Sequence, residues 1–366
     1  MKKLILTLII GLLCMPTYAV DSLTEDFVIG NPEIGSINAM TFGPEGILFL
    51  GDSKNSQVVA VDMSSAKKAT NQKLYLKDIE ALLGQLLGSD SDQLQIIDMV
   101  VNPVNQNIYL GAQHSSGKSF LFLVNNNTLE NVPLKSVSFS KVNVSNVVNA
   151  DAKDRRGRPL RSLAITDIQF ANGQIMVSGL SNAEFASTFR AIPFPFTNKQ
   201  SDSSLEIYHA AHGKYETHAP IKTFMTTTIN NQPHIIASYT CTPLVVFPME
   251  SLTPGSHTKG RTVAELGNWN TPLDIIEMTN NKGKRFILMA NSNRALMKFK
   301  VSDIESFGNS LTTRVKERAG TEGVDFINLP FVNVQQLDKL NDKEFVFIQR
   351  ESNGKLALKT SSNRWL

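Results

Sequence analysis

Three histidines and a glutamate that could bind a transition metal lie close together in the chain: His209, His212, Glu216 and His218. The whole chain contains six histidines, so half of them fall in this short segment. Imidazole nitrogens and carboxylate oxygens are ligands of zinc and copper. The segment is therefore a candidate metal site.

The same segment has a second interpretation that needs no metal. Ile207-Tyr208 and the turn at His212-Gly213 predict a hairpin in which His209 lies opposite Glu216. Cross-strand pairs of opposite charge stabilise sheets. A metal site would need His218 to reach the same point, which the alternation of a strand does not favour. Both interpretations stay open at this stage.

Oxygen-bearing side chains near the starts of five apolar strands form another candidate site. They are Asn38, Asp98, Asp167, Asp274 and Asn333, and a sixth strand offers Lys222 or Thr223. A hard cation such as Ca²⁺ takes about 6 to 8 oxygen ligands. If the strands surround one axis, the set predicts a calcium site. The alternative is that these residues only line a solvated channel.

Cys241 stands between Thr240 and Thr242, directly after an apolar strand. A nucleophilic cysteine requires a base within hydrogen-bond reach. His234 is the nearest histidine on that strand, and it stands too far along the strand to serve. We therefore predict a buried, inert thiol.

An aromatic segment between residues 185 and 196 could bind a partner. It is predicted to be a long loop that either packs onto the body of the protein or presents an apolar docking surface. Its phenylalanines are Phe185, Phe189, Phe194 and Phe196.

A repeat must position these side chains. Six segments share one plan, in which an apolar strand, a turn of Gly, Asn or Pro, and a second strand follow one another. They are Ile37–Leu50, Ile97–Gly111, Ile165–Ser178, Ile221–Ala237, Leu273–Ala290 and Val332–Ile348. Their starts lie about 50 to 70 residues apart, which suits four-stranded propeller blades with long loops.

A third strand follows each pair, and helical signal is confined to Leu76–Leu87. The sixth repeat stops after three strands, whereas an unassigned strand, Asp26–Gly30, precedes the first. We therefore predict an all-β fold, a single propeller of six blades spanning residues 20–366, with Asp26–Gly30 as the outer strand of the last blade. A seventh blade would have to lie within Ser140–Arg161.

The N-terminus has the pattern of a signal peptide. Lys2 and Lys3 precede the apolar run Leu4–Leu13, and Thr17-Tyr18-Ala19 supplies the small residues of a cleavage site. Cleavage after Ala19 predicts a periplasmic or secreted protein. Lipidation at Cys14 is the rival, but the residues before it lack the small pair that such a site has.

Composition limits the possible partners. The formal charge of +3 falls to +1 once the two charges of Lys2 and Lys3 are removed, which argues against a nucleic-acid surface. After Ala19 no segment is apolar enough to span a membrane. Only Cys241 of the two cysteines remains in the mature chain, so no intramolecular disulfide forms there.

Four stretches resemble a group of exported bacterial propeller proteins. They are Gly179–Thr188, Ala211–Pro220, Tyr239–Pro243, and Pro272–Asp274 together with Met289–Ser292. The resemblance implies the fold and the exported location, and it carries no catalytic residue. More loosely, the repeats are similar to six-bladed calcium-dependent lactonases, an architecture shared with many proteins that are not enzymes.

Two functions are compatible with these features. The first is a propeller that binds a partner protein or a small ligand through one face, with a structural divalent cation in its channel. The second is a metal-dependent hydrolase of lactones or esters, using Asp98, Asp167 and Asp274 around the ion. No histidine stands in a first strand to act as a base, which favours the binding protein.

Overall fold

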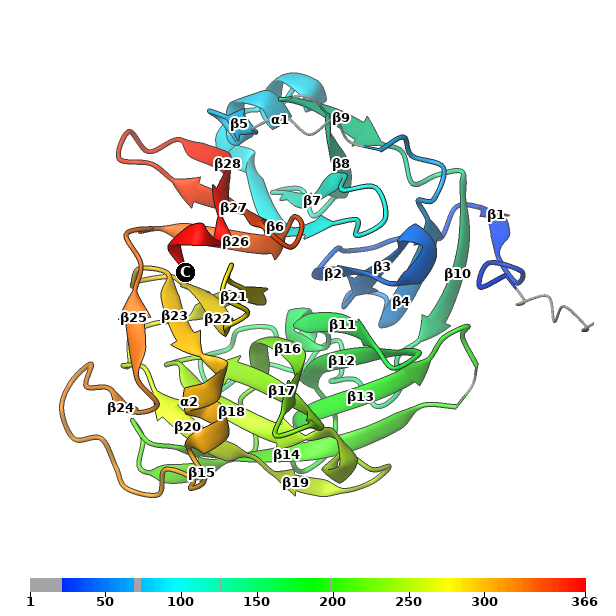
Figure 1. Cartoon of the computed structure of the whole chain (residues 1–366). Coiled ribbons are helices and arrows are strands. Elements are labelled where there is room, and N and C mark those ends of the chain that lie inside the picture. The colour runs from blue at the N-terminus through cyan, green and yellow to red at the C-terminus, as the bar shows by residue number, and fades with distance from the viewer. Residues whose placement is uncertain (1–21, 69–73, 126, 198) are drawn as a thin grey trace, which may run out of the picture.

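A computed structural model describes residues 22–68, 74–125, 127–197 and 199–366; the predicted signal peptide lies outside these ranges. The described residues form six mainly antiparallel sheets arranged as blades around one axis (Figure 1). The protein is therefore a six-bladed β-propeller, as the repeats predict. The segment that could have held a seventh blade contributes only strand β10 (Val137–Asn143) and loops.

Each blade has four strands, counted from the axis outward, and we number the blades by the order of their inner strands in the chain. The inner strands are β2 (Ala39–Phe42), β6 (Leu94–Val101), β11 (Asp167–Ala171), β16 (Ile221–Ile229), β21 (Pro272–Thr279) and β26 (Val334–Lys339). The second strands are β3 (Ile47–Asp52), β7 (Ile108–His114), β12 (Gln174–Leu180), β17 (Gln232–Tyr239), β22 (Arg285–Asn291) and β27 (Glu344–Arg350).

The third strands lie where the repeat predicts them in five blades, whereas in blade 3 the segment predicted as the third strand, which ends at His209, belongs to the fourth. They are β4 (Gln57–Asp62), β8 (Ser119–Asn125), β13 (Ser187–Pro193), β18 (Pro243–Pro248), β23 (Met297–Lys300) and β28 (Leu356–Ser362). The fourth strands are β10, β9 (Thr128–Val132), β14 (Ser201–His209), β20 (Arg261–Glu265), β25 (Phe326–Asn328) and β5 (Tyr75–Leu76).

Shorter elements extend three blades at their outer edges. Strand β1 (Val28–Gly30) pairs with β10, β15 (Lys214–Glu216) and β19 (His257–Lys259) pair with β14, and β24 (Glu322–Gly323) pairs with β20. The helices of the described residues are α1 (Ile79–Leu87), which confirms the predicted helical insert, and the short α2 (Val301–Ser306), which was not predicted.

The order of blades around the ring differs from their order in the chain. Blade 1 lies between blades 2 and 3, and blade 2 lies beside blade 6 (Figure 1). Six apolar clusters fill the interfaces, one for each neighbouring pair of blades. Burial of side chains between sheets is the main stabilising term in such a ring.

The predicted closure names the wrong strand. A strand from an earlier part of the chain does complete the last blade, as predicted. The N-terminal segment does not reach the last blade, because Val28 pairs with Phe139 in β10 of blade 1. Blade 6 is completed instead by β5, where Leu76 pairs with Leu358. The chain leaves blade 1 after three strands, closes blade 6, builds blade 2 and then returns with β10 to complete blade 1.

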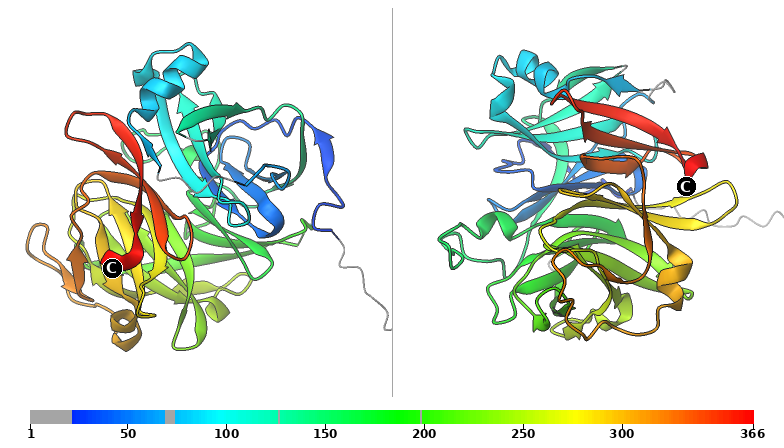
Figure 2. Two further views of the ribbon diagram at one scale, coloured as in Figure 1. Left: turned by 45° about the horizontal axis from the view of Figure 1, so that its top comes forward. Right: turned by 90° about the vertical axis from the view of Figure 1, so that its left-hand side faces the viewer.

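Helix α1 covers the seam between blades 2 and 6 at the rim of the ring (Figures 1 and 2). The Asp78 side chain caps its first turn by accepting a hydrogen bond from the Ala81 N–H at 3.2 Å, and Gly88 ends it in the left-handed conformation. Ile79 and Leu83, one turn apart, are buried against the two blades. In the described part of the chain, no helix is long and apolar enough to cross a membrane.

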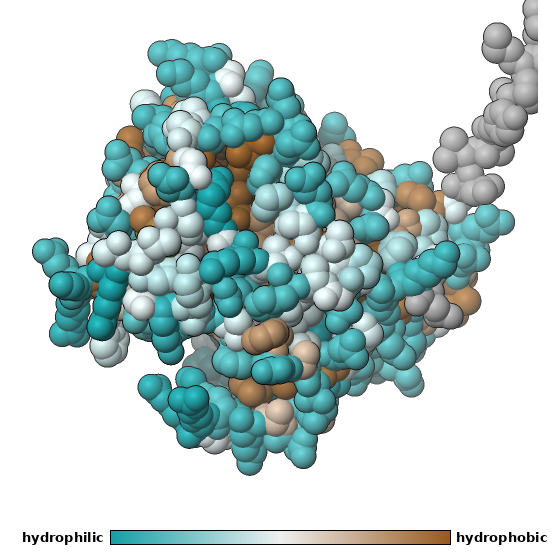
Figure 3. Space-filling view, turned by 90° about the horizontal axis from the view of Figure 1, so that it is seen from below, coloured by the Kyte–Doolittle hydropathy of each residue, from teal (hydrophilic) through white to brown (hydrophobic). Residues whose placement is uncertain are grey.

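The predicted aromatic loop contains strand β13, so the expectation of a loop is corrected, whereas its packing onto the body of the protein is confirmed. Phe189 is buried against Phe224 between blades 3 and 4, and Phe194 is buried among the rings of Phe27 and Phe49. Phe196 is partly buried in the same cluster, which leaves Phe185, stacked on an imidazole, as the exposed ring. The segment fills the core because its alternating apolar side chains face two blade interfaces. The face seen in Figure 3 likewise shows only small, separate apolar patches.

Candidate metal centre

The turn between β14 and β15 gathers three of the four predicted ligands. His209 ends β14 and is only 2 % exposed, whereas the side chain of His212 is 45 % exposed. The N–H groups of His212 and Gly213 both donate to the His209 carbonyl, which closes a tight turn. Gly213 has a φ of +67°, so the turn suits a glycine. Glu216, at the end of β15, then faces the two imidazoles.

Glu216 holds both histidines in one orientation. Its Oε2 lies 2.9 Å from Nδ1 of His209, and its Oε1 lies 2.7 Å from Nδ1 of His212. Burial raises the pKa of Glu216, but the two hydrogen bonds from the histidines outweigh it and lower the pKa to about 2. The carboxylate is therefore ionised and only accepts, so each Nδ1 carries the hydrogen. With each Nδ1 bonded to Glu216, Nε2 is the other ring nitrogen that could bind a metal.

The third ligand comes from blade 4, in the turn between β17 and β18. Cys241 and Thr242 both have positive φ, of 66° and 57°, which is a costly conformation for residues with a side chain. The turn is held by the Cys241 N–H, which donates to the Asn270 carbonyl at 2.9 Å, and by Thr242 Oγ1, which donates to the Gly267 carbonyl at 2.9 Å. Backbone strain of this kind is typical of functional sites.

The turns of blades 3 and 4 bring two nitrogens and a sulfur together. One ring nitrogen of His209, one of His212 and the Cys241 Sγ all lie within 4.8 Å of one another. Among the residues that the structure describes, no other group of three His, Cys, Asp or Glu side chains meets this condition. Zn–N bonds of about 2.0–2.1 Å and Zn–S bonds of about 2.3 Å place the ligands of a tetrahedral site roughly 3.3–3.8 Å apart, so a small contraction would suffice.

The site also contains polar atoms without protein partners. Nε2 of His209 is buried and has no hydrogen-bond partner among the described residues. Its closest acidic neighbour is Glu265, fully buried, whose Oε2 accepts from the Ala211 N–H at 2.9 Å and lies 3.9 Å from that nitrogen. Leaving a buried polar atom unpaired costs about 1–3 kcal/mol, which a bound metal would remove. The donor set and this free nitrogen fit a zinc-class ion.

The structure corrects two details of the predicted histidine site. His209 pairs with Lys214 in the sheet, so Glu216 reaches it diagonally from beside Ile207. His218 is exposed and stays outside the group, and Cys241 takes the place that it was expected to fill. The thiol is therefore partly exposed beside two imidazoles, so the prediction that it is buried is wrong. In the sequence a pair of strands separates Cys241 from the two histidines, so residue spacing did not indicate that the thiol lies beside them.

The predicted channel residues have a different arrangement. Asp98, Asp167 and Asp274 lie on inner strands, and each uses both carboxylate oxygens to accept backbone hydrogen bonds. One oxygen accepts from the next residue of its own strand, and the other accepts from the neighbouring blade at Met40 (2.6 Å), Phe224 (2.8 Å) or Leu337 (2.8 Å). Asp338 bridges blade 6 to Val101 of blade 2 in the same way, at 2.7 Å.

These four carboxylates are half-buried inside the ring and repel one another. Burial raises the pKa of Asp167 to about 7 and that of Asp338 to about 6. Burial and the neighbouring carboxylates together raise the pKa of Asp98 and Asp274 well above the ordinary range. The ring therefore joins neighbouring blades and gathers four carboxyl groups whose ionisation is suppressed.

The two predicted asparagine ligands lie apart from this ring. Asn38 Oδ1 accepts from Ser36 Oγ at 2.7 Å and from the Ser53 N–H at 2.9 Å. Asn333 is exposed ahead of β26, with a φ of 56°, and Asp338 occupies the inner strand instead. The alignment of the sixth repeat missed Asp338 because it placed Asn333, which precedes the strand, at the ligand position. Calcium in the channel stays a prediction.

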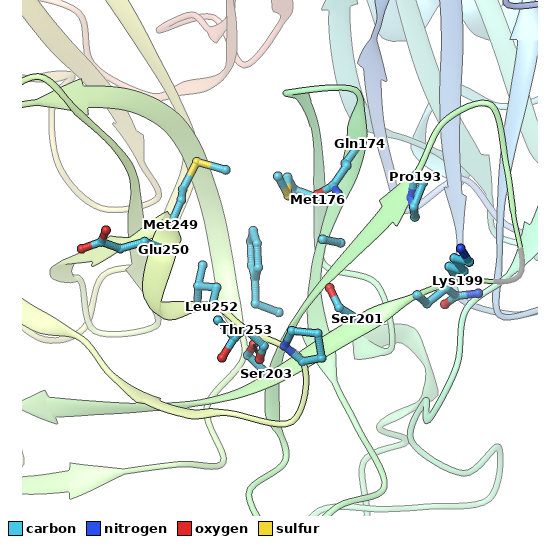
Figure 4. Close-up of a pocket in the computed structure, with 14 residues that line it drawn as sticks. Gln174, Met176, Pro193, Lys199, Ser201, Ser203, Met249, Glu250, Leu252 and Thr253 are labelled. Atoms are coloured by element: carbon cyan, nitrogen blue, oxygen red, sulfur yellow. Dashed lines mark hydrogen bonds between the residues drawn. The ribbon is translucent and has the colours of Figure 1, made fainter.

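A pocket lies between blades 3 and 4, at the ends of their strands opposite to the candidate metal centre (Figure 4). It has a volume of about 530 Å³ and is lined by Met176, Met249 and Leu252 as well as by Ser201 and Ser203. Its charged lining residues are Lys199 and Glu250. The described lining offers no histidine, cysteine or aspartate, so the metal chemistry belongs to the other face.

The fold and the site define a six-bladed β-propeller with a candidate metal centre on the face where the inner strands begin. No family model matches the chain, and no curated protein sequence matches it. The propeller implied by both sequence resemblances is confirmed, whereas no match supports membership in either family.

Several solved structures are similar in fold. Drosophila Plexin A, in complex with Semaphorin 1b, aligns with 92 % of this chain and 86 % of its own, at 12 % identity and a TM-score of 0.38. PorZ of Porphyromonas gingivalis aligns over 91 % and 38 %, at 9 % identity and a TM-score of 0.37. The PQQ-bound aldose sugar dehydrogenase of Streptomyces coelicolor aligns over 92 % and 98 %, at 10 % identity and a TM-score of 0.33.

Proposed function

We propose that this protein is an exported metal-binding propeller that holds one zinc-class transition metal through His209, His212 and Cys241. One observation carries the proposal: a single carboxylate, Glu216, lies within hydrogen-bond distance of Nδ1 of both imidazoles, and one nitrogen of each ring lies within 4.8 Å of the Cys241 thiol. Histidine ligands of metals characteristically donate their other ring N–H to a carboxylate. Two imidazoles and a thiolate suit zinc or copper far better than calcium or magnesium.

Three protein ligands leave one coordination position for water or another molecule. The exposed imidazole of His212 makes the centre reachable from solvent. The face where the inner strands begin is therefore the proposed binding face of the propeller, for a small ligand or for a partner protein that supplies the fourth ligand.

Hydrolysis of an ester or lactone is the second candidate function. An accessible metal with an open position polarises a carbonyl and activates water. The exposure of His212 favours this candidate over a purely structural ion, because structural zinc sites are closed by four protein ligands. In this second candidate function the catalytic ion is bound at the histidine and cysteine site, and a channel cation beside Asp98, Asp167 and Asp274 would be structural.

Metal content tests the proposal directly. The whole chain is expressed, purified without chelator and analysed by mass spectrometry, with an expected content of about one zinc or copper per chain. The ion is then replaced by Co²⁺, whose bond to a thiolate gives a charge-transfer band in the near ultraviolet. Cys241→Ser should abolish that band, and His212→Ala should release the metal.

Matched controls are available on the same protein. His218 lies in the same segment and His234 on the strand before Cys241, and neither belongs to the group of ligands. His218→Ala and His234→Ala should keep both the metal and the cobalt band. A chain without stoichiometric transition metal, or a cobalt spectrum unchanged by Cys241→Ser, would overturn the proposal.

A further inference from the structure

The loop that follows α2 brings cationic side chains to the metal centre. Its Val315 N–H donates to the Ala210 carbonyl at 3.0 Å, and its Ala319 N–H donates to Asn268 Oδ1 at 2.9 Å. Arg314 packs on Gly213, the residue after His212, where a Cβ would lie 2.8 Å from its Cγ and Cδ. The loop therefore runs from the histidine turn to the loop that supports Cys241.

Arg294 reaches the same place from blade 5. Its guanidinium packs on Gly267, whose φ of +92° and close contacts leave no room for a side chain. The carbonyl of Gly267 holds Thr242, the neighbour of Cys241. The Nε of Arg294 is buried and has no hydrogen-bond partner among the described residues. The cationic side chain of Arg294, with an Nε–H that has no partner among the described residues, therefore lies beside the turn that contains Cys241.

Trp269 adds an exposed aromatic face. Its side chain is 69 % exposed and its φ is +63°, an unusual conformation for a bulky residue. The turn is fixed because Asn293 Nδ2 donates to the Trp269 carbonyl at 2.6 Å, and the next residue, Asn270, accepts from the Cys241 N–H. The Arg318 guanidinium lies 5.3 Å from the ring centroid. A tryptophan held in this way serves as a platform for stacking.

The charges at this place are not neutralised by the protein. Across the described residues, no ion pair joins Arg294 or Arg318 to a carboxylate. Guanidinium groups recognise carboxylates and phosphates through paired hydrogen bonds. One such group lies against Gly267 and another lies over the Trp269 ring, in the loop whose Gly267 and Asn270 carbonyls hold the Cys241 turn.

We propose that the metal centre takes a ring-bearing oxyanion, with its carboxylate or phosphate bound by Arg294 and Arg318 and its ring stacked on Trp269. This inference rests on the proposed metal site, because that site supplies the binding position beside the arginines. It adds the chemical class of the ligand. The ring-bearing anion approaches from the side on which His212 is exposed.

Tryptophan fluorescence tests the ligand class. The chain has two tryptophans, so a Trp365→Phe protein reports on Trp269 alone. Metal-loaded protein is titrated with benzoate and phenyl phosphate, which separate the two oxyanions. Benzyl alcohol lacks the anion, and inorganic phosphate and acetate lack the ring. We expect saturable quenching by benzoate or phenyl phosphate and at least tenfold weaker binding of the other three.

The arginines are tested against a matched control. Arg364 lies over the other exposed tryptophan, Trp365, at 4.5 Å from its ring centroid. Arg294→Gln and Arg318→Gln should each weaken binding by about 10- to 100-fold, as expected for a lost hydrogen bond to a charged group. Arg364→Gln should leave it unchanged. Circular dichroism and metal content are measured on each variant to establish that it is folded and loaded.

The outcomes separate this inference from the proposed function. Metal-loaded protein that binds none of the probes, binds benzyl alcohol as well as benzoate, or binds inorganic phosphate as tightly as phenyl phosphate overturns the inference and leaves the metal site standing. Equal affinity in Arg294→Gln, Arg318→Gln and Arg364→Gln also overturns it. A chain that holds no transition metal removes the proposed function and, with it, the ligand position beside the metal.

Discussion

His209 and Glu216 lie on adjacent strands of blade 3, and Nδ1 of the histidine is 2.9 Å from Oε2 of the glutamate. This contact holds a buried imidazole in one orientation, and its Nε2 has no hydrogen-bond partner among the described residues. The same carboxylate orients His212 with its other oxygen. Metal binding at the proposed centre would therefore depend on a residue that is not itself in the ligand group.

Replacing Glu216 by glutamine should weaken metal binding by about 10- to 100-fold without removing a ligand, because outer-shell partners of metal-bound histidines have effects of this size. The measurement is competition with a chelator of known affinity. Glu206→Gln is the control, since Glu206 pairs with Lys259 on the same blade, away from the centre. Equal affinity of the two variants would contradict the positioning role of Glu216.

Removal of the metal should destabilise the protein, because the ion would tie blade 3 to blade 4. Bound metal at 1,000 times its Kd contributes about 4 kcal/mol to the free energy of unfolding. We expect a chelator to lower the midpoint of thermal unfolding and zinc to restore it, as followed by differential scanning calorimetry. In Cys241→Ser the chelator should have no further effect. A wild-type midpoint that is insensitive to chelator would contradict the prediction.

The channel carboxylates predict a stability that decreases as pH rises. The pKa values of Asp167 and Asp338 in the folded state, about 7 and about 6, lie above the value of about 3.9 in an unfolded chain. The folded state therefore binds more protons, so this stabilisation is complete below about pH 4 and is lost as pH rises through 6 to 7. Urea unfolding between pH 5 and 8 should show it, and Asp338→Asn should flatten the slope.

Calcium can be tested in the same experiment. A cation among the four carboxylates would relieve their repulsion, so millimolar Ca²⁺ should raise the free energy of unfolding above pH 7. The increase should shrink in Asp98→Asn and persist in Cys241→Ser, which separates the channel from the histidine and cysteine site. An identical unfolding curve with and without Ca²⁺ would remove the predicted channel ion.

Closure by β5 makes a prediction about two apolar side chains near the N-terminus. Leu76 is 2 % exposed where β5 meets β28, whereas Ile29 in β1 is 82 % exposed. Leu76→Ala should lower the free energy of unfolding by about 2–5 kcal/mol, since it removes buried methyl groups from the seam of the ring. Ile29→Ala should change it by no more than about 0.5 kcal/mol. Urea unfolding of the two variants measures both, and the reverse order would contradict this closure.

The sequence by itself determined the number of blades and most of their strands, although it did not reveal β13. Pairs of inner and second strands, such as Ile97–Gly111, can be predicted because two short runs rich in β-branched and aromatic residues are separated by turn residues. Asp98, Asp167 and Asp274 were visible for the same reason, because each stands at a similar place in a local pattern, whereas Asp338 was missed. The grouping of His209, His212 and Glu216 could also be predicted, because the three residues lie on either side of one turn.

Only the tertiary structure decided which distant parts meet. Every blade has the same strand plan, so nothing local tells whether Asp26–Gly30 or Tyr75–Leu76 closes blade 6, or that blade 1 lies between blades 2 and 3. That order follows from how the six apolar interfaces pack. Cys241 joins the histidines because blades 3 and 4 are neighbours in the ring and a strained turn points the thiol at their interface. The candidate metal centre is a property of the assembled ring because its residues come from two blades that no local pattern connects.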